Sequence, residues 1–165
     1  MVKNVLTTRE HELMKSEKDI LKIRKVMVAV DGSESSAKAV KVAAEIAKNN
    51  SAELTILHVM TVPYSAFSGD VPLPLSQIEK DARHAGDKYV TDAVNSIKTY
   101  GIKPKTEMIE WYDSPVKGIT QFAEKHDIDL IVVGTRGLGG FKRLVLGSVA
   151  SGVVHYARCS VTVVR

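Results

Sequence analysis

Short runs of β-branched and other apolar residues alternate with helix-forming segments from residue 25 to residue 165. The runs that predict strands lie at residues 25–31, 52–60, 105–111, 127–134 and 160–165. Helix-forming sequence separates them at residues 33–49, 75–101, 114–126 and 147–157. This alternation favours a parallel sheet covered by helices on both faces. We therefore expect a single-domain open α/β fold with five parallel strands. The alternation does not itself set their order, which we expect to be 3-2-1-4-5.

Capping residues mark where several of these segments begin and end. Ser33 or Ser35 can cap the first helix, and Ser114 followed by Pro115 opens the third. Gly101 is a natural C-cap for the long second helix. Residues 61–74 hold three prolines and a glycine, so they predict a loop. Residues 1–24 are polar and partly helix-forming, and we interpret them as an extension of the domain at 25–165.

Composition narrows the classes of partner. A net charge of +4 is too modest to indicate DNA binding. An aromatic content of only 5% counts against binding of single-stranded nucleic acid, which relies on bases stacking on aromatic side chains. No apolar run is long enough to span a membrane. The single cysteine, Cys159, excludes an intrachain disulfide and a cysteine-rich metal site. We expect a cytoplasmic protein with neither a nucleic-acid nor a membrane partner.

A glycine-rich segment follows the apolar run at 127–134. Glycines stand at 137, 139 and 140, and helical sequence resumes at Gly147-Ser148. Glycines permit close approach of a ligand to the backbone, and a helix N-terminus favours an anion. Neither the dinucleotide pattern G-x-G-x-x-G nor the Walker pattern G-x-x-x-x-G-K-[ST] is present. The segment predicts a phosphate site of another kind.

Asp31 ends the first predicted strand. Ligands of open α/β sheets bind beyond the C-terminal ends of the strands, where the strand order reverses. If the first and fourth strands are neighbours, Asp31 faces the glycine segment, where its carboxylate can accept hydrogen bonds from ribose hydroxyls. The alternative is an aspartate that only stabilises the turn.

The spacing Gly134-x-x-Gly137, nine residues, then Gly147-Ser148 resembles the nucleotide-binding signature of the universal stress protein family. The resemblance covers residues 25–165 and includes Val-Ala-Val-Asp31-Gly-Ser, Leu-His58-Val and the closing Val-Thr-Val-Val. It implies an adenine nucleotide alpha hydrolase-like fold, ATP (or AMP or ADP) as ligand, and a homodimer formed through the strand at 160–165.

The resemblance also implies a set of binding residues. Adenine would lie near Ala29, Val30 and Val59, with Asp31 at the ribose. The residues that would wrap the ribose and phosphates are Gly134, Thr135, Arg136, Gly137, Leu138, Gly139, Gly140, Gly147, Ser148, Val149 and Ala150.

Other candidates stay open. Arg136, Lys142 or Arg143 could reach a phosphate or simply face solvent, and Met60, Tyr64 and Phe67 could line the adenine or pack in the core. The histidines have no metal-ligand spacing, and we interpret His58 as structural. Mg²⁺ or Mn²⁺ would be held by phosphates and water, because no carboxylate cluster offers a metal site.

No catalytic residue is predicted, because Ser148 has no identifiable base partner in the sequence. We therefore expect an ATP-binding sensor or regulator of the stress response with little or no catalysis. Two alternatives remain: a slow ATPase, and an interaction module that binds no nucleotide.

Overall fold

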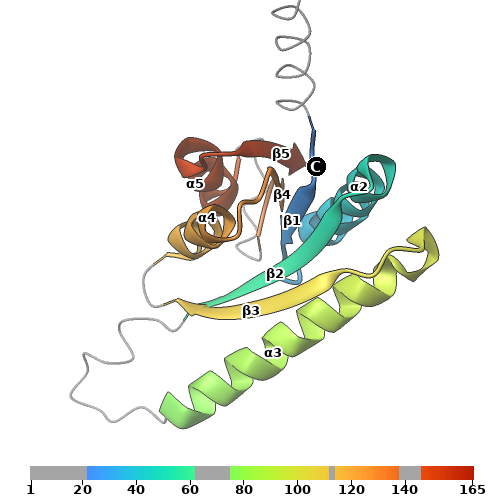
Figure 1. Ribbon diagram of the computed structural model, residues 1–165. Coiled ribbons are helices and arrows are strands. Elements are labelled where there is room, and N and C mark those ends of the chain that lie inside the picture. Colours follow the sequence, from blue (N-terminus) through green and yellow to red (C-terminus); the bar gives the residue numbers. More distant parts are fainter. Residues whose placement is uncertain (1–21, 62–74, 112–113, 138–145) are drawn as a thin grey trace, which may run out of the picture.

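The structure is a computed structural model that describes residues 22–61, 75–111, 114–137 and 146–165 (Figure 1). Strands and helices alternate along these residues, as the sequence predicts. The strands are β1 (Lys25–Ala29), β2 (Glu53–Thr61), β3 (Lys105–Trp111), β4 (Leu130–Gly134) and β5 (Ser160–Val164). The helices are α2 (Glu34–Asn50), α3 (Leu75–Ser96), α4 (Pro115–Lys125) and α5 (Ser148–Tyr156), with a 3₁₀ turn at Lys98–Tyr100.

The strands form one parallel five-stranded sheet in the order β3-β2-β1-β4-β5, which confirms the predicted topology. β1 is central: Val26 pairs with Leu54 of β2 on one side and with Leu130 of β4 on the other. The order therefore reverses between β1 and β4, and the C-terminal ends of these two strands flank the point where ligands bind in such sheets.

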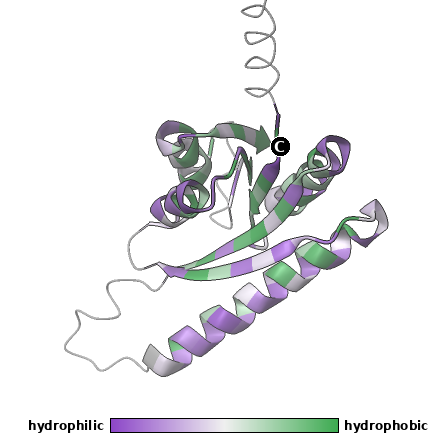
Figure 2. Cartoon of the chain, viewed as in Figure 1, coloured by the Kyte–Doolittle hydropathy of each residue, from purple (hydrophilic) through white to green (hydrophobic). Residues whose placement is uncertain are grey.

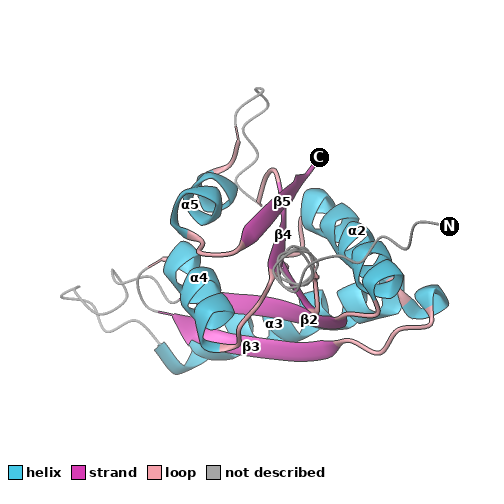
Figure 3. Cartoon of the chain, turned by 45° about the horizontal axis from the view of Figure 1, so that its top comes forward, coloured by secondary structure: helices cyan, strands magenta, loops and turns pink. Residues whose placement is uncertain are grey.

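Alternate residues of each strand supply two separate cores. Val26 and Val28 lie under α2 and α3, while Met27 between them packs under α4 and α5. Figures 1 and 3 show α4 and α5 together on one side of the sheet, with α2 and α3 on the other. In Figure 2 each helix carries both hydrophilic and hydrophobic residues, as expected for helices that cover a sheet with one face. Both faces are thus covered, as predicted.

Two helix starts follow from capping side chains. Ser33, rather than Ser35, caps α2, and its hydroxyl oxygen accepts a hydrogen bond from the Ser36 N–H at 3.2 Å. Ser114 caps α4 by accepting from the Val116 N–H at 3.3 Å, with Pro115 in the first turn. Each cap satisfies a backbone donor that the helix itself leaves free.

The second helix ends earlier than predicted. α3 stops at Ser96, and the 3₁₀ turn then leads to Gly101, which adopts φ 72°. Ile97 and Tyr100 still pack on the core, because a 3₁₀ turn places residues three apart on one face. Gly101 therefore caps the short turn rather than the long helix.

The fourth strand starts later than predicted. Asp127 has φ 51°, which is incompatible with a strand, and β4 begins only at Leu130. Asp129 instead uses its side chain: Oδ2 accepts the N–H groups of Arg24 and Lys25 at 2.7 and 2.8 Å. This carboxylate fixes the entry into β1.

Parts of the predicted organisation fall outside the described residues. These are residues 1–21 of the predicted extension and residues 62–74 of the predicted loop. Ile23, at the end of the predicted extension, packs against the core under α2. Within the residues that the structure describes, no helix is both long and apolar enough to cross a membrane.

Candidate functional site

Asp31 lies two residues beyond the end of β1, and Gly134 ends the neighbouring strand β4. The Asp31 Oδ1 atom accepts hydrogen bonds from the Ser33 N–H at 3.0 Å and the Ser33 hydroxyl at 2.6 Å. Its second oxygen faces Gly137, where an added Cβ atom would lie 2.6 Å from Oδ2. The fold therefore brings Asp31 and the start of the glycine segment together. Among the described residues Oδ2 has no hydrogen-bond donor, so it can accept one from a ligand.

The start of α2 holds the glycine segment in place. Arg136 is anchored through its backbone: its N–H donates to the Ser35 hydroxyl oxygen at 3.3 Å, and its carbonyl accepts from that hydroxyl. Ser33 Oγ also lies 3.1 Å from the Arg136 carbonyl, but its single proton has a shorter contact with Asp31. Sequence reasoning treated these serines only as caps. The only sequence signal for the contact with Arg136 is that α2 begins with more serines than one cap requires.

Gly134 and Gly147 allow the chain to pack closely on itself. A Cβ at Gly134 would lie 2.5 Å from Ser35 Oγ and 2.8 Å from the Ser36 backbone nitrogen. A Cβ at Gly147 would lie 2.9 Å from the Thr135 carbonyl oxygen. Gly137 differs, because among the described residues only Asp31 supplies atoms within 4 Å of an added Cβ there. Two glycines of the motif thus serve packing, and Gly137 keeps the space before Asp31 open.

Backbone hydrogen bonds join the two ends of the glycine segment. The Gly147 N–H donates to the Thr135 carbonyl at 2.8 Å, and the Thr135 N–H donates to Val164 at the end of β5 at 2.7 Å. The segment therefore leaves and re-enters the fold at one place, beside the last residue of the edge strand.

The N-terminus of α5 has no capping side chain among the described residues. Its N-cap is Gly147, which makes no side-chain hydrogen bond, whereas serines cap α2 and α4. The N–H groups of the first turn carry a partial positive charge that favours an anion. Ser148 is exposed at this end, while Ala150 is 3% exposed and can offer a ligand only its backbone.

The predicted adenine residues separate onto two faces of the sheet. Ala29 and Val59 are half-buried and pack on the α4 and α5 side. Val30 points the other way, 5% exposed under α2, and both its backbone groups are hydrogen-bonded, to Leu57 and His58. Ala29 and Val59 thus lie on one face of the sheet, and the Val30 side chain lies on the other.

Several predicted residues lie outside the described residues. They are Tyr64, Phe67, Leu138, Gly139, Gly140, Lys142 and Arg143. The described part of the chain contains no group of three or more histidine, cysteine, aspartate or glutamate side chains that could hold a metal ion.

Two titratable groups near these elements have shifted pKa values. In the first turn of α2, the hydrogen bond and the charge of Lys38, 2.9 Å away, lower the pKa of Glu34. Burial raises the pKa of the Cys159 thiol just before β5, so this thiol stays protonated at neutral pH. Asp31 is not among the causes of either shift.

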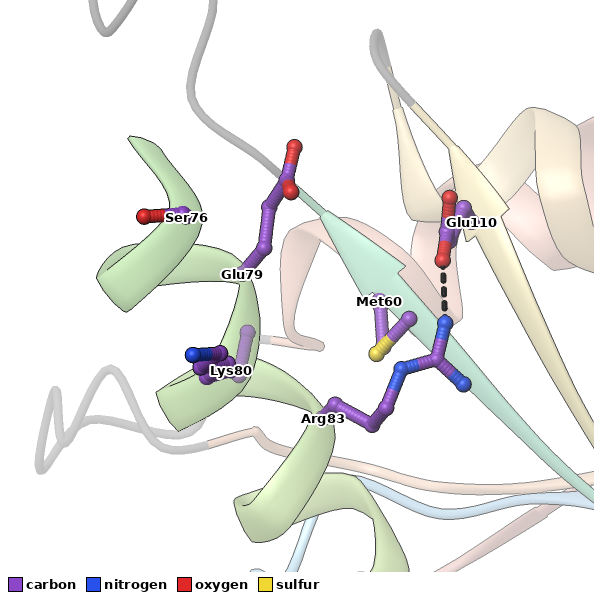
Figure 4. A pocket seen from close by; sticks show the side chains of 7 residues that line it. Met60, Ser76, Glu79, Lys80, Arg83 and Glu110 are labelled. Atoms are coloured by element: carbon purple, nitrogen blue, oxygen red, sulfur yellow. Dashed lines mark hydrogen bonds and ion pairs between the residues drawn. The ribbon is translucent and has the colours of Figure 1, made fainter. Parts of the chain in front are cut away.

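A cavity of about 220 Å³ lies apart from this site, between α3 and the ends of β2 and β3 (Figure 4). An ion pair of 2.5 Å between Arg83 and Glu110 crosses it. Met60 lines it, so this side chain lies on the α3 side and away from Ala29 and Val59. The lining residues are Met60, Ser76, Glu79, Lys80, Ala82, Arg83 and Glu110.

Comparisons with a family model and with a curated protein point to the same family. The model of the universal stress protein family matches residues 22–165. Universal stress protein YxiE of Bacillus subtilis is 36% identical over 147 residues, which cover 86% of this chain and 98% of YxiE.

Solved structures share the fold, which is adenine nucleotide alpha hydrolase-like. Universal stress protein UspA from Lactobacillus plantarum has a TM-score of 0.68 at 28% identity, covering 87% of this chain and 99% of its own. A universal stress protein solved in complex with cAMP has a TM-score of 0.65 at 25% identity, covering 87% of this chain and 98% of its own. The chain therefore belongs to the universal stress protein family.

Proposed function

We propose that this protein binds an adenine nucleotide, with ATP as the principal ligand, at the C-terminal ends of β1 and β4. The observation that carries the proposal is the Oδ2 atom of Asp31, which faces Gly137 and accepts no hydrogen bond from any described residue. A carboxylate there accepts hydrogen bonds from ribose hydroxyls, and the uncapped start of α5 offers backbone donors to the phosphates. A related universal stress protein that was solved with cAMP supports an adenine ligand.

The remaining site residues take complementary roles. Ala29 and Val59 would contact the base from the α4 and α5 side, and the residues from Gly134 to Gly140 would wrap the phosphates. Ser148, Val149 and Ala150 would donate backbone hydrogen bonds at the start of α5. A divalent cation such as Mg²⁺ or Mn²⁺ would be held by the phosphates and water.

The nucleotide would act as a regulatory ligand in a cytoplasmic stress response, with little or no hydrolysis. The test is calorimetric titration of the purified protein with ATP, together with an assay of phosphate release. Saturable binding, with phosphate release no higher than that of a Ser148→Ala variant, is the expected result. Release well above that variant would favour the slow ATPase instead. An empty protein with no response to ATP, ADP or AMP would overturn the proposal in favour of an interaction module.

Replacing Asp31 by asparagine should weaken ATP binding roughly 10- to 100-fold, because a hydrogen bond to a charged group contributes about 1.5–3 kcal/mol. Asparagine keeps an oxygen for the Ser33 N–H, so the turn is preserved. Titrations with ATP and with 2′,3′-dideoxy-ATP check the assignment: the wild type should prefer ATP, and the variant should lose most of that preference.

The matched control is Asp127→Asn, which removes the same charge from an exposed residue whose left-handed backbone conformation asparagine tolerates. Its affinity should equal that of the wild type. An Asp31→Asn variant that still discriminates between the two nucleotides as strongly as the wild type would exclude Asp31 from the ribose site.

We also propose a homodimer formed through β5. This strand lies at the edge of the sheet, and Val161 and Val163 on it are only half-buried. Nearby on α5, Val154 and Tyr156 are 50% and 67% exposed. An apolar edge of this kind invites pairing with another chain. Sedimentation equilibrium should give twice the 18.0 kDa of one chain; a species of one chain at micromolar concentration would refute the dimer.

A further inference from the structure

A buried histidine on β2 reaches the backbone that carries Asp31. His58 is 8% exposed, and its Nδ1 atom lies 2.7 Å from the Val30 carbonyl oxygen. A carbonyl only accepts, so Nδ1 carries the proton and donates it. The Val30 N–H in turn donates to Leu57 at 2.9 Å. The residue before Asp31 is therefore fixed by hydrogen bonds on both its backbone groups.

The residue after Asp31 is fixed from α3. Gly32 has φ +80°, and an added Cβ atom there would lie 2.3 Å from Cε1 of Tyr89. The same Tyr89 ring meets His58 edge-on, with ring centroids 5.5 Å apart at 74°. Gly86, one turn earlier in α3, lets His58 approach, because a Cβ there would lie 2.7 Å from its Cδ2 atom. Tyr89 thus contacts both the histidine and the turn.

We infer that His58 and Tyr89 are positioning residues that hold the Asp31 carboxylate toward the nucleotide, an inference that rests on the proposed function. β1 ends at Ala29, so the segment from Val30 to Gly32 lies beyond the regular strand. His58 holds its first residue and Tyr89 covers its last. The side chain between them is the one whose Oδ2 atom faces Gly137. A histidine that only filled the core would need its volume but not its Nδ1 proton.

Two substitutions of His58 separate these roles. Both remove the ring, but the side-chain amide of asparagine can place its nitrogen where Nδ1 lies, whereas glutamine places its nitrogen where Nε2 lies. Both variants should unfold at a lower temperature than the wild type. His58→Asn should bind ATP within about threefold of the wild type, and His58→Gln about tenfold more weakly, the order expected for one lost hydrogen bond.

A second measurement needs no nucleotide. The Ser33 N–H donates to Asp31 Oδ1 at 3.0 Å, so its amide resonance in a ¹H–¹⁵N spectrum reports the position of the carboxylate. This resonance should move in His58→Gln and stay near its wild-type position in His58→Asn. If the wild type binds no adenine nucleotide but the resonance moves only in His58→Gln, the proposed function falls and the positioning of Asp31 stands.

Substitutions of Tyr89 test the inference even if the His58 variants do not fold. Tyr89→Phe keeps the ring against Gly32 and should bind ATP like the wild type, whereas Tyr89→Ala should bind about as weakly as His58→Gln. The inference is overturned if His58→Gln matches His58→Asn, or Tyr89→Ala matches Tyr89→Phe, in both ATP affinity and the Ser33 resonance.

Discussion

Replacing Gly137 by valine is expected to weaken ATP binding by more than about 100-fold while leaving the stability of the fold almost unchanged. The Cβ atom alone would lie 2.6 Å from Asp31 Oδ2, so the carboxylate would have to turn away from the ribose. The loss combines the hydrogen bonds of a charged group with the bulk of valine in the space for phosphates. Because Gly137 is exposed, valine disturbs no core packing.

Calorimetric titration with ATP and thermal unfolding of the same samples check both halves of this prediction. The smaller substitution Gly137→Ala should weaken ATP binding less than Gly137→Val, because it adds the Cβ atom without the two methyl groups. Normal ATP affinity in Gly137→Val would show that nucleotide, if bound, lies elsewhere than before Asp31.

Replacing Gly134 by alanine is expected to have the opposite outcome, a large loss of stability. The added Cβ would lie 2.5 Å from Ser35 Oγ and 2.7 and 2.8 Å from backbone atoms of Ser35 and Ser36. Backbone atoms cannot rotate away as side chains do, so β4 and the start of α2 must move apart. Overpacking of this kind costs about 3 kcal/mol of unfolding free energy, which lowers the unfolding temperature by about 10 °C.

Urea denaturation monitored by circular dichroism measures this loss, with Gly137→Ala as the matched control. The control introduces the same methyl group within the same motif but should change the unfolding free energy by less than about 0.5 kcal/mol. Equal stability of the Gly134 and Gly137 variants would show that β4 and α2 do not need to approach so closely.

The alternation of strands and helices could be predicted because its determinants are local in the sequence. β3 occupies the predicted residues, and Ser114 with Pro115 begins α4 where expected. The ends of elements were less predictable. The apolar spacing through Ile97 and Tyr100 fits both an α-helix and a 3₁₀ turn, and only the backbone geometry distinguishes them. The left-handed backbone conformation of Asp127 likewise cannot be recognised from the apolar residues that follow it.

The site shows the same division. The proximity of Asp31 and Gly137 was predictable, because parallel strands bring their C-terminal ends to one edge. The hydrogen bonds between the Ser35 hydroxyl and the Arg136 backbone join residues that are 101 positions apart, and no sequence pattern encodes such a pairing. The face of the sheet on which the Val30 side chain lies could not be predicted either, because a shift of one residue in a strand changes that face.

The hydrogen bond between Gly147 and Thr135 has a consequence for ligand preference. Closing a loop costs conformational entropy, and this cost rises only with the logarithm of loop length. Here the fold itself joins the two ends of the loop, so nucleotide binding does not meet the cost of bringing them together. Insertions or deletions between residues 136 and 146 should therefore change which phosphate groups fit while the sheet and its stability stay the same. Loop length becomes a means of altering ligand preference on a constant scaffold.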